Sequence, residues 1–240
     1  MNPNPTNPTK RPGRKLRPIL TRNRLHDEHR SIENVLDMVG EIILGKRRQV
    51  SLAISCLLAR GHLLNEDIPW VGKTTLAQVL ARALGLDFSR IQFTSDLLPA
   101  DVVGITIYRT ETETFKFQPG PVFSEVVLAD ELNRATPKAQ SALLEAMEEH
   151  QVTVDGESHQ LPEPFFVIAT QNPVNHIGTF PLPESQLDRF LMRIEIGYPN
   201  RTVERDLLTR RDPRKLLSGI KPLMNSEQVV GLQEAAATVH

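Results

Sequence analysis

The sequence predicts an α/β fold in which one parallel sheet lies between two layers of helices. Two observations predict it: compact apolar runs of strand length alternate with stretches of helical spacing, and glycine or proline ends most of them. Strands that alternate with helices pair in parallel, and the helices cover both faces of the sheet. Such sheets bind ligands at the carboxyl ends of their strands. We therefore expect the polar residues that follow the strands to lie close together.

The N-terminal half supplies three helices and two strands of this alternation. Ser31 opens an apolar run at helical spacing that Gly45 ends, and Gly85 ends a later alanine- and leucine-rich helix. The short apolar runs beside these helices have the length of strands. In chain order, the predicted elements are helix 31–44, helix 48–59, strand 62–65, helix 73–84 and strand 88–93.

The C-terminal half continues the alternation, and two β-hairpins interrupt it. Residues 152–161 alternate around an Asp-Gly turn, and residues 105–117 do the same around a longer polar tip. A minimal doubly wound sheet contains neither hairpin, so we expect both to project as insertions, either as decoration or as contacts for a partner. The remaining predicted elements are strand 125–129, helix 137–149, strand 165–170, strand 193–199 and helix 226–239.

Composition limits the class of protein. Of the 240 residues, 40% are hydrophobic and 24% charged, which is typical of globular domains. No run approaches the roughly 18 apolar residues of a membrane helix, and the single cysteine, Cys56, is expected to be a buried apolar side chain in a reducing compartment. We expect a cytoplasmic protein without a membrane span.

The first 30 residues differ from the rest of the chain. They carry eight basic residues against two acidic ones, contain four prolines within the first twelve positions and lack apolar periodicity, so we expect them to be disordered. A basic arm of this kind can bind nucleic acid. Because no aromatic residues alternate with the charges as base-stacking surfaces require, we expect a solvated tail and no nucleic-acid partner.

The stretch NEDIPWVGKTT, residues 65–75, matches the second half of a phosphate-binding loop. It lies between a predicted strand and a predicted helix, and Gly72, Lys73 and Thr74 match the end of the signature Gly-x₄-Gly-Lys-Ser/Thr. Backbone N–H groups at the helix start would face phosphate oxygens, Lys73 would reach the outer phosphates, and the Thr74 hydroxyl would ligate magnesium. The expected nucleotide-binding residues are Asp67, Ile68, Pro69, Trp70, Val71, Gly72, Lys73, Thr74 and Thr75.

Polar residues also follow the later strands. One apolar strand ends in Asp130 and Glu131, where an aspartate can hold magnesium and the next carboxylate can activate the attacking water. Asn172 follows another strand, and Arg189 follows a short helix, where a guanidinium can stabilise phosphoryl charge, including that of a neighbouring subunit. Taken singly, the acids read as a capped strand end, Asn172 as a turn former and Arg189 as a surface ion-pair partner. Their order and spacing together favour the catalytic interpretation.

With these motifs the sequence resembles the MoxR group of AAA+ ATPases over about residues 31–212. The resemblance implies a P-loop AAA+ fold and a magnesium-dependent ATPase that assembles into a ring, usually hexameric. It also implies chaperone-like remodelling, often with von Willebrand factor A-domain partners. The matching motifs are RIQFTSDLLPADVVG (90–104), GPVFSEVVLADELNRATPKAQSALLEAMEEHQVTVDG (120–156), PFFVIATQNPV (164–174) and FPLPESQLDRFLMRIEIGYP (180–199).

The resemblance also assigns roles to individual positions. It implies ATP and Mg²⁺ as cofactors, Thr74 and Asp130 as metal ligands, and Glu131, Asn172 and Arg189 as catalytic residues. In the family's terms, Lys73 and Thr74 match Walker A, Asp130 and Glu131 match Walker B, Asn172 matches the first sensor, Arg189 matches the arginine finger, and the segment around Gly45 borders the adenine pocket.

Two features depart from the family pattern. Trp70 replaces a glycine that is expected to adopt positive φ beside the phosphates. A non-glycine residue there costs about 1–3 kcal/mol, which weakens binding by roughly 5- to 150-fold if the strain falls on the bound form. The family also continues into a helical lid, whereas residues 200–240 supply a linker and one predicted helix.

We therefore expect three parts: a tail over 1–30, an AAA+ α/β ATPase core over 31–199, and a linker with an incomplete, truncated helical lid over 200–240. The expected function is ATP hydrolysis coupled to remodelling of partner proteins. The alternative, favoured by Trp70 and the short lid, is a degenerate, non-hydrolysing paralogue that acts as a structural or interaction subunit.

Overall fold

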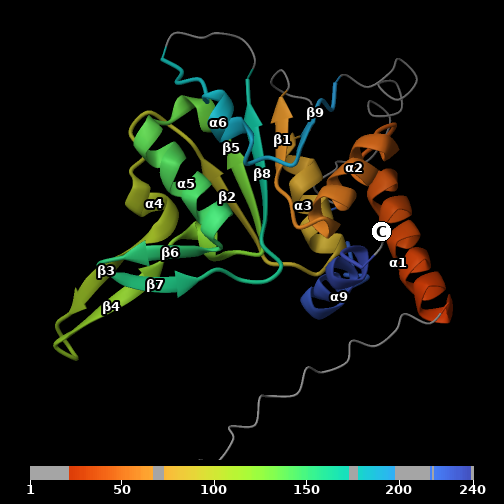
Figure 1. Cartoon of the computed structure of the whole chain (residues 1–240), viewed down its shortest axis with the longest axis horizontal. Coiled ribbons are helices and arrows are strands. Elements are labelled where there is room, and N and C mark those ends of the chain that lie inside the picture. Colours follow the sequence, from red (N-terminus) through yellow and green to blue (C-terminus); the bar gives the residue numbers. More distant parts are fainter. Residues whose placement is uncertain (1–21, 67–72, 173–177, 198–216, 218, 239–240) are drawn as a thin grey trace, which may run out of the picture.

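The central sheet of the molecule is the predicted parallel one. The structure is a computed structural model of the 240-residue chain, and it describes residues 22–66, 73–172, 178–197, 217 and 219–238. The strand order is β2-β5-β8-β1-β9, and every neighbouring pair is parallel (Figure 1). The strands are β1 (Leu63–Glu66), β2 (Phe88–Gln92), β5 (Val126–Asp130), β8 (Phe166–Gln171) and β9 (Met192–Ile194).

Helices cover both faces of this sheet, as predicted. Helices α1, α2, α3 and α9 lie on one face, and α5 lies on the other with α4 nearby (Figure 1). In the described residues, no helix combines the length and the apolar character that crossing a bilayer requires. The helices are α1 (Arg22–Ile42), α2 (Arg47–Leu58), α3 (Lys73–Ala83), α4 (Pro99–Val103), α5 (Pro137–Glu149), α6 (Glu184–Leu187) and α9 (Ser226–Ala236), with 3₁₀ helices η1 (Pro121–Phe123) and η2 (Leu132–Arg134).

The two faces of the sheet carry separate hydrophobic clusters. Along β5 and β8 every apolar residue is buried, and successive residues alternate between the clusters. Val126 and Leu128 belong to the cluster that contains α3, and so do Phe166 and Ile168. Because side chains alternate along a strand, this register points the next residues of that series, Asp130 on β5 and Thr170 on β8, toward the α3 side.

The N-terminal boundary of helix α1 differs from the one that the sequence predicts. Helix α1 begins at Arg22 rather than Ser31, so part of the expected tail is helical; arginine, leucine and glutamate favour helices even without an apolar face. Helix α9 packs on the core: Val229 and Leu232 join the α3-side cluster, and the Gln233 side chain donates to the Leu57 carbonyl at 2.7 Å. Residues 198–216 lie outside the described residues.

Both predicted hairpins are present and extend away from the central sheet (Figure 1). One consists of β3 (Gly104–Arg109) and β4 (Thr114–Pro119), the other of β6 (Gln151–Val154) and β7 (Glu157–Gln160). The Phe117 ring stacks on the His159 ring, with centroids 3.8 Å apart. The two hairpins therefore contact each other through an aromatic pair.

A buried histidine makes the stability of this fold depend on pH. His62 Nδ1 accepts from the Val167 N–H at 3.1 Å, and Nε2 donates to the Met147 carbonyl at 3.3 Å. Burial lowers the pKa of His62 from 6.5 to about 4. The unfolded chain therefore binds a proton on His62 more tightly than the folded chain does. Neutral His62 makes its full contribution to the free energy of unfolding above pH 6.5, and this contribution is lost as the pH falls toward 4.

We expect protonation of His62 to lower the free energy of unfolding by about 3 kcal/mol when the pH falls from 7 to 4. Each unit of the His62 pKa shift corresponds to about 1.36 kcal/mol. Urea unfolding of the wild type and of His62→Gln at both pH values measures this contribution. The stability difference between the two proteins should shrink or reverse at low pH, because glutamine does not titrate. A difference that is the same at both pH values contradicts the prediction.

Candidate functional site

The predicted site residues follow three strands that are neighbours in the sheet. Strand β8 lies between β5 and β1, and its register pairs Ala169 with Ala129 on one side and Gln171 with Glu66 on the other. The carboxyl ends of the three strands therefore meet at one edge. The structure thus brings together the acids after β5, the polar residues after β8 and the end of β1, which leads to the phosphate-binding loop.

A buried threonine fixes the acidic pair at the end of β5. The Thr170 hydroxyl donates to Asp130 Oδ1 at 2.7 Å and accepts from the Glu131 N–H at 2.8 Å. Glu131 has a φ of 58°, a left-handed conformation that costs a non-glycine residue about 1–2 kcal/mol. The Thr170 hydrogen bond to the Glu131 N–H stabilises this turn.

The second oxygen of Asp130 is paired with an arginine from the neighbouring strand β2. Arg90 Nη2 and Nε lie 2.6 and 3.2 Å from Asp130 Oδ2, and Arg90 Nη2 also donates to Gln92 Oε1 at 2.7 Å. The Asp130 side chain is 13% exposed, whereas that of Arg90 is 46% exposed. Asp130 is therefore a nearly buried carboxylate whose charge is balanced at Oδ2 by the Arg90 guanidinium.

Glu131 lies at the rim of the site. Its Oε2 accepts from Gln92 Nε2 at 3.0 Å and from Arg134 Nη1 at 2.8 Å, and one third of its side chain is exposed. A carboxylate can accept a proton from a bound water, which is the chemistry that the sequence predicts for this position.

A network of buried amides fixes the segment around Asn172. Asn133 Nδ2 donates to the Asn172 carbonyl at 3.1 Å, and the Asn133 carbonyl accepts from the Phe180 N–H at 2.7 Å. The Gln140 amide, which is almost fully buried, donates to carbonyls of η2, of the following turn and of Phe180. These bonds hold the residue after β8 beside the helix that follows Glu131.

Strand β1 ends next to the predicted phosphate-binding loop. The Glu66 carboxylate bonds the Gln171 amide and is ion-paired with Arg193. Asn65 is buried, and among the described residues neither of its amide atoms has a hydrogen-bond partner. An unpaired buried polar group costs about 1–3 kcal/mol, and proteins carry such costs mainly at functional sites.

The structure describes only the last part of the predicted loop. Lys73 is the first residue of α3, Thr74 and Thr75 follow in its first turn, and all three are partly exposed. Helix α3 packs on β5, the strand that ends in Asp130. The expected contacts at Asp67, Ile68, Pro69, Trp70, Val71 and Gly72 lie outside the described residues.

Arg189 does not join the other predicted residues within one chain. It is ion-paired with Glu148, in the last turn of α5. Helix α5 begins at Pro137, shortly after Glu131, so Glu148 lies about 16 Å further along the helix axis. In the single chain, Arg189 is the surface ion-pair partner that the simpler interpretation predicts.

The oxygen donors present fit magnesium in the company of a phosphate. In the described part of the chain, no group of three or more His, Cys, Asp or Glu residues forms a metal site. Mg²⁺ commonly takes one or two protein oxygens, several waters and substrate phosphates. The Asp130 carboxylate and the Thr74 hydroxyl are oxygen donors of the kind that Mg²⁺ takes alongside phosphates.

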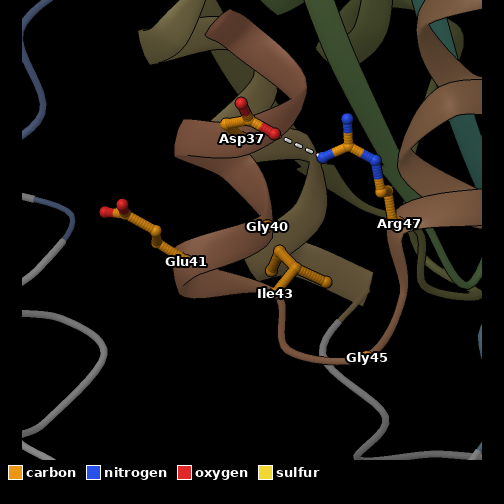
Figure 2. A pocket seen from close by; sticks show the side chains of 6 residues that line it. All are labelled: Asp37, Gly40, Glu41, Ile43, Gly45 and Arg47. Carbon is orange, nitrogen blue, oxygen red and sulfur yellow. Dashed lines mark hydrogen bonds and ion pairs between the residues drawn. The ribbon is translucent and has the colours of Figure 1, made fainter. Parts of the chain in front are cut away.

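The segment around Gly45 borders a cavity of about 490 Å³ between α1 and α2. Figure 2 shows Arg47 facing Asp37 across the turn between the two helices, with Glu41 pointing away. Arg47 bonds Asp37 at 2.5 Å and Glu33 at 2.6 Å. The segment expected to border the adenine pocket is therefore held by ion pairs beside an open cavity.

Sequence reasoning missed the polar residues that hold the acidic pair. Arg90 and Gln92 come from β2, Thr170 from β8 and Arg134 from η2. Arg90 and Gln92 are two residues apart in a strand and so share one face. This spacing was the only local feature of the sequence that could have indicated that the two residues act together. Their partners depend on β2 lying beside β5, and residue spacing alone does not encode that pairing.

Comparisons with known proteins place the chain in a family. A family model described as "ATPase family associated with various cellular activities (AAA)" matches residues 62–192. The chain is 48% identical over 213 residues to YeaC, an uncharacterized protein of Bacillus subtilis (strain 168), covering 89% of this chain and 67% of YeaC. It is 43% identical over 210 residues to Chaperone MoxR1 of Mycobacterium tuberculosis, covering 88% of this chain and 55% of that protein.

A crystal structure from Cytophaga hutchinsonii has the same fold. It superposes with a TM-score of 0.81 and is 38% identical, covering 89% of this chain and 65% of that one. The predicted α/β fold is thus confirmed. The chain spans between about half and two thirds of the length of the relatives it matches.

Proposed function

This chain belongs to the MoxR family of AAA+ ATPases, and we propose that it binds ATP with Mg²⁺ and hydrolyses it to remodel partner proteins. One observation carries the proposal. Asp130 and Glu131 share the Thr170 hydroxyl on β8, and β8 pairs directly with β1, the strand that leads to Lys73. An ammonium group and two carboxylates at one sheet edge are what a magnesium–triphosphate requires.

Each residue has a role in this mechanism. Lys73 would bind the outer phosphates, and Thr74 and Asp130 would be the protein ligands of the metal. Mg²⁺, when bound, supplies positive charge that stabilises the phosphate oxygens. Glu131 accepts the proton of the attacking water, and Asn172 orients that water or the terminal phosphate.

Ring assembly completes the proposed site. The Arg189 ion pair with Glu148 leaves its guanidinium at the far end of α5 from Glu131, which favours action on the nucleotide of a neighbouring subunit. A ring, hexameric as the family resemblance implies, supplies such a neighbour. We extend the chaperone role of the MoxR1 relative, by its name, to this chain, with von Willebrand factor A-domain proteins as candidate partners.

A non-hydrolysing paralogue that serves as a structural or interaction subunit is the second candidate. The observation that favours it is Trp70, which stands where the family resemblance implies a glycine. Strain at that position weakens nucleotide binding without removing any catalytic residue. The two functions therefore differ first in nucleotide affinity and then in turnover.

We expect Mg·ATP to change the fluorescence of Trp70, the only tryptophan of the chain, and Lys73→Ala to abolish the change. Lys116→Ala, an exposed lysine on the β4 hairpin strand, is the matched control and should respond as the wild type does. Phosphate release measured on the same samples tests hydrolysis. Unchanged fluorescence at millimolar ATP in folded protein contradicts binding, and binding without phosphate release identifies the non-hydrolysing subunit.

A further inference from the structure

The Asp130 carboxylate has partners on both oxygens before any cation arrives. Oδ1 accepts from the buried Thr170 hydroxyl at 2.7 Å, and Oδ2 accepts from Arg90 Nη2 and Nε at 2.6 and 3.2 Å. Thr170 is fully buried and also bonds the Glu131 N–H, so it belongs to the rigid part of the site. Oδ2 is the oxygen on the side of the more exposed partner, Arg90.

A divalent cation and a guanidinium compete for that oxygen. Magnesium lies about 2.0–2.1 Å from its ligands, so a cation on Oδ2 would lie within a few ångströms of Arg90. Like charges at this separation repel strongly where water is largely excluded, and the Asp130 side chain is only 13% exposed. One of the two cations has to leave Oδ2.

Arg90 is the partner that can leave. It lies on β2, the edge strand of the sheet, and its side chain is 46% exposed. Its Nη2 also donates to Gln92 Oε1 at 2.7 Å on the same strand. The guanidinium can therefore move toward Gln92 and water without burying an unpaired charge.

We propose that Arg90 is a positioning residue that competes with the divalent cation for Asp130, so that metal binding displaces the guanidinium from Oδ2. Without metal, Arg90 neutralises Asp130 and holds its carboxylate against Thr170. The competition lowers the affinity of the site for metal alone, and nucleotide phosphates are needed to offset it. The proposal rests on the proposed function, because it assumes that Asp130 is a metal ligand.

Manganese binding tests the proposal without measuring turnover. The full chain with saturating ADP is titrated with MnCl₂, and free Mn²⁺ is followed by electron paramagnetic resonance. Arg90→Gln removes the competing charge and should bind Mn²⁺ more tightly, by about 5- to 150-fold if the coupling is of ordinary size. Arg90→Lys keeps a charge without the two-pronged contact and should fall between Arg90→Gln and the wild type.

Two controls make the result specific to this contact. Arg109→Gln, on the exposed end of β3, removes the same charge elsewhere and should bind Mn²⁺ as the wild type does. In an Asp130→Asn background, Arg90→Gln should have no further effect, because the shared oxygen no longer carries charge. Melting curves check that each variant is folded, and Arg90→Lys keeps the test valid if Arg90→Gln is not.

The outcomes separate this proposal from the proposed function. Equal or weaker Mn²⁺ binding by folded Arg90→Gln and Arg90→Lys overturns the competition, while a wild type that still binds and hydrolyses Mg·ATP leaves the proposed function intact. Gains in Mn²⁺ affinity that persist in the Asp130→Asn background also overturn it. If no variant, the wild type included, binds Mn²⁺ in the presence of nucleotide, both proposals fail.

Discussion

Glu131→Gln is expected to lower the rate of ATP hydrolysis by about 10²- to 10⁴-fold, the usual contribution of a general base, while nucleotide binding persists. Glutamine has the same size, and its amide oxygen can still accept from Gln92 and Arg134, which donate to Glu131 Oε2. It cannot take up a proton from water. The backbone bond to Thr170 and the left-handed turn do not involve the side chain.

Phosphate release gives the rate, and the fluorescence of Trp70 gives the affinity. Glu125→Gln is the matched control, because Glu125 precedes the first residue of the same strand and bonds the Asp87 N–H at the opposite end of the sheet. It should hydrolyse ATP as the wild type does. Turnover of Glu131→Gln within a few fold of the wild type would remove Glu131 from the chemical step.

The sheet could be predicted because burial on both faces leaves a strong local pattern. Strands β5 and β8 are continuous apolar runs, as buried parallel strands are. Helix α5 was predicted over 137–149 and has those bounds, since Pro137 starts it and His150 ends it in a left-handed conformation. Strand β9 was expected over 193–199 but spans Met192–Ile194, and Gly197 beyond it has a φ of 65°, which no strand adopts.

The sequence predicted the site residues only where they lie at the ends of strands. Asp130 ends β5, Glu131 follows it and Asn172 follows β8, so the alternation alone placed these three residues at one sheet edge. The contact between Arg90 and Asp130 joins residues 40 positions apart, across helix α4 and the β3–β4 hairpin. It exists because β2 lies beside β5, and strand order follows from packing of the whole chain rather than from any local pattern.

The sequence also could not identify the partner of Arg189, because that contact too depends on how distant elements pack. The sequence predicts either a surface ion pair or a catalytic guanidinium for a neighbour, and the single chain contains the ion pair with Glu148. The two interpretations are compatible. Arg189 is one third exposed, and an exposed ion pair contributes at most about 1 kcal/mol, so an approaching subunit can replace it at little cost.

Arg189→Ala is therefore expected to reduce hydrolysis by about 10³- to 10⁵-fold, as removal of an arginine finger does, with small effects on stability and on Trp70 fluorescence. If the guanidinium serves the next subunit, two inactive variants can complement each other. A mixed ring contains interfaces where the Arg189→Ala subunit supplies an intact Lys73 and its neighbour, Lys73→Ala, supplies an intact Arg189. Random mixing in equal amounts should restore about a quarter of the wild-type rate, since one interface in four has this order in a head-to-tail ring.

Phosphate release from the mixture, compared with that of each variant alone, measures this recovery. Glu148→Gln removes the carboxylate partner but keeps the guanidinium, and it should remain active, which separates loss of the ion pair from loss of the charge. A mixture as inactive as its components, although subunits exchange and each variant is folded, would contradict action between subunits. Because one chain holds Arg189 at the far end of α5 from Glu131, that result would leave Arg189 with only its structural contact.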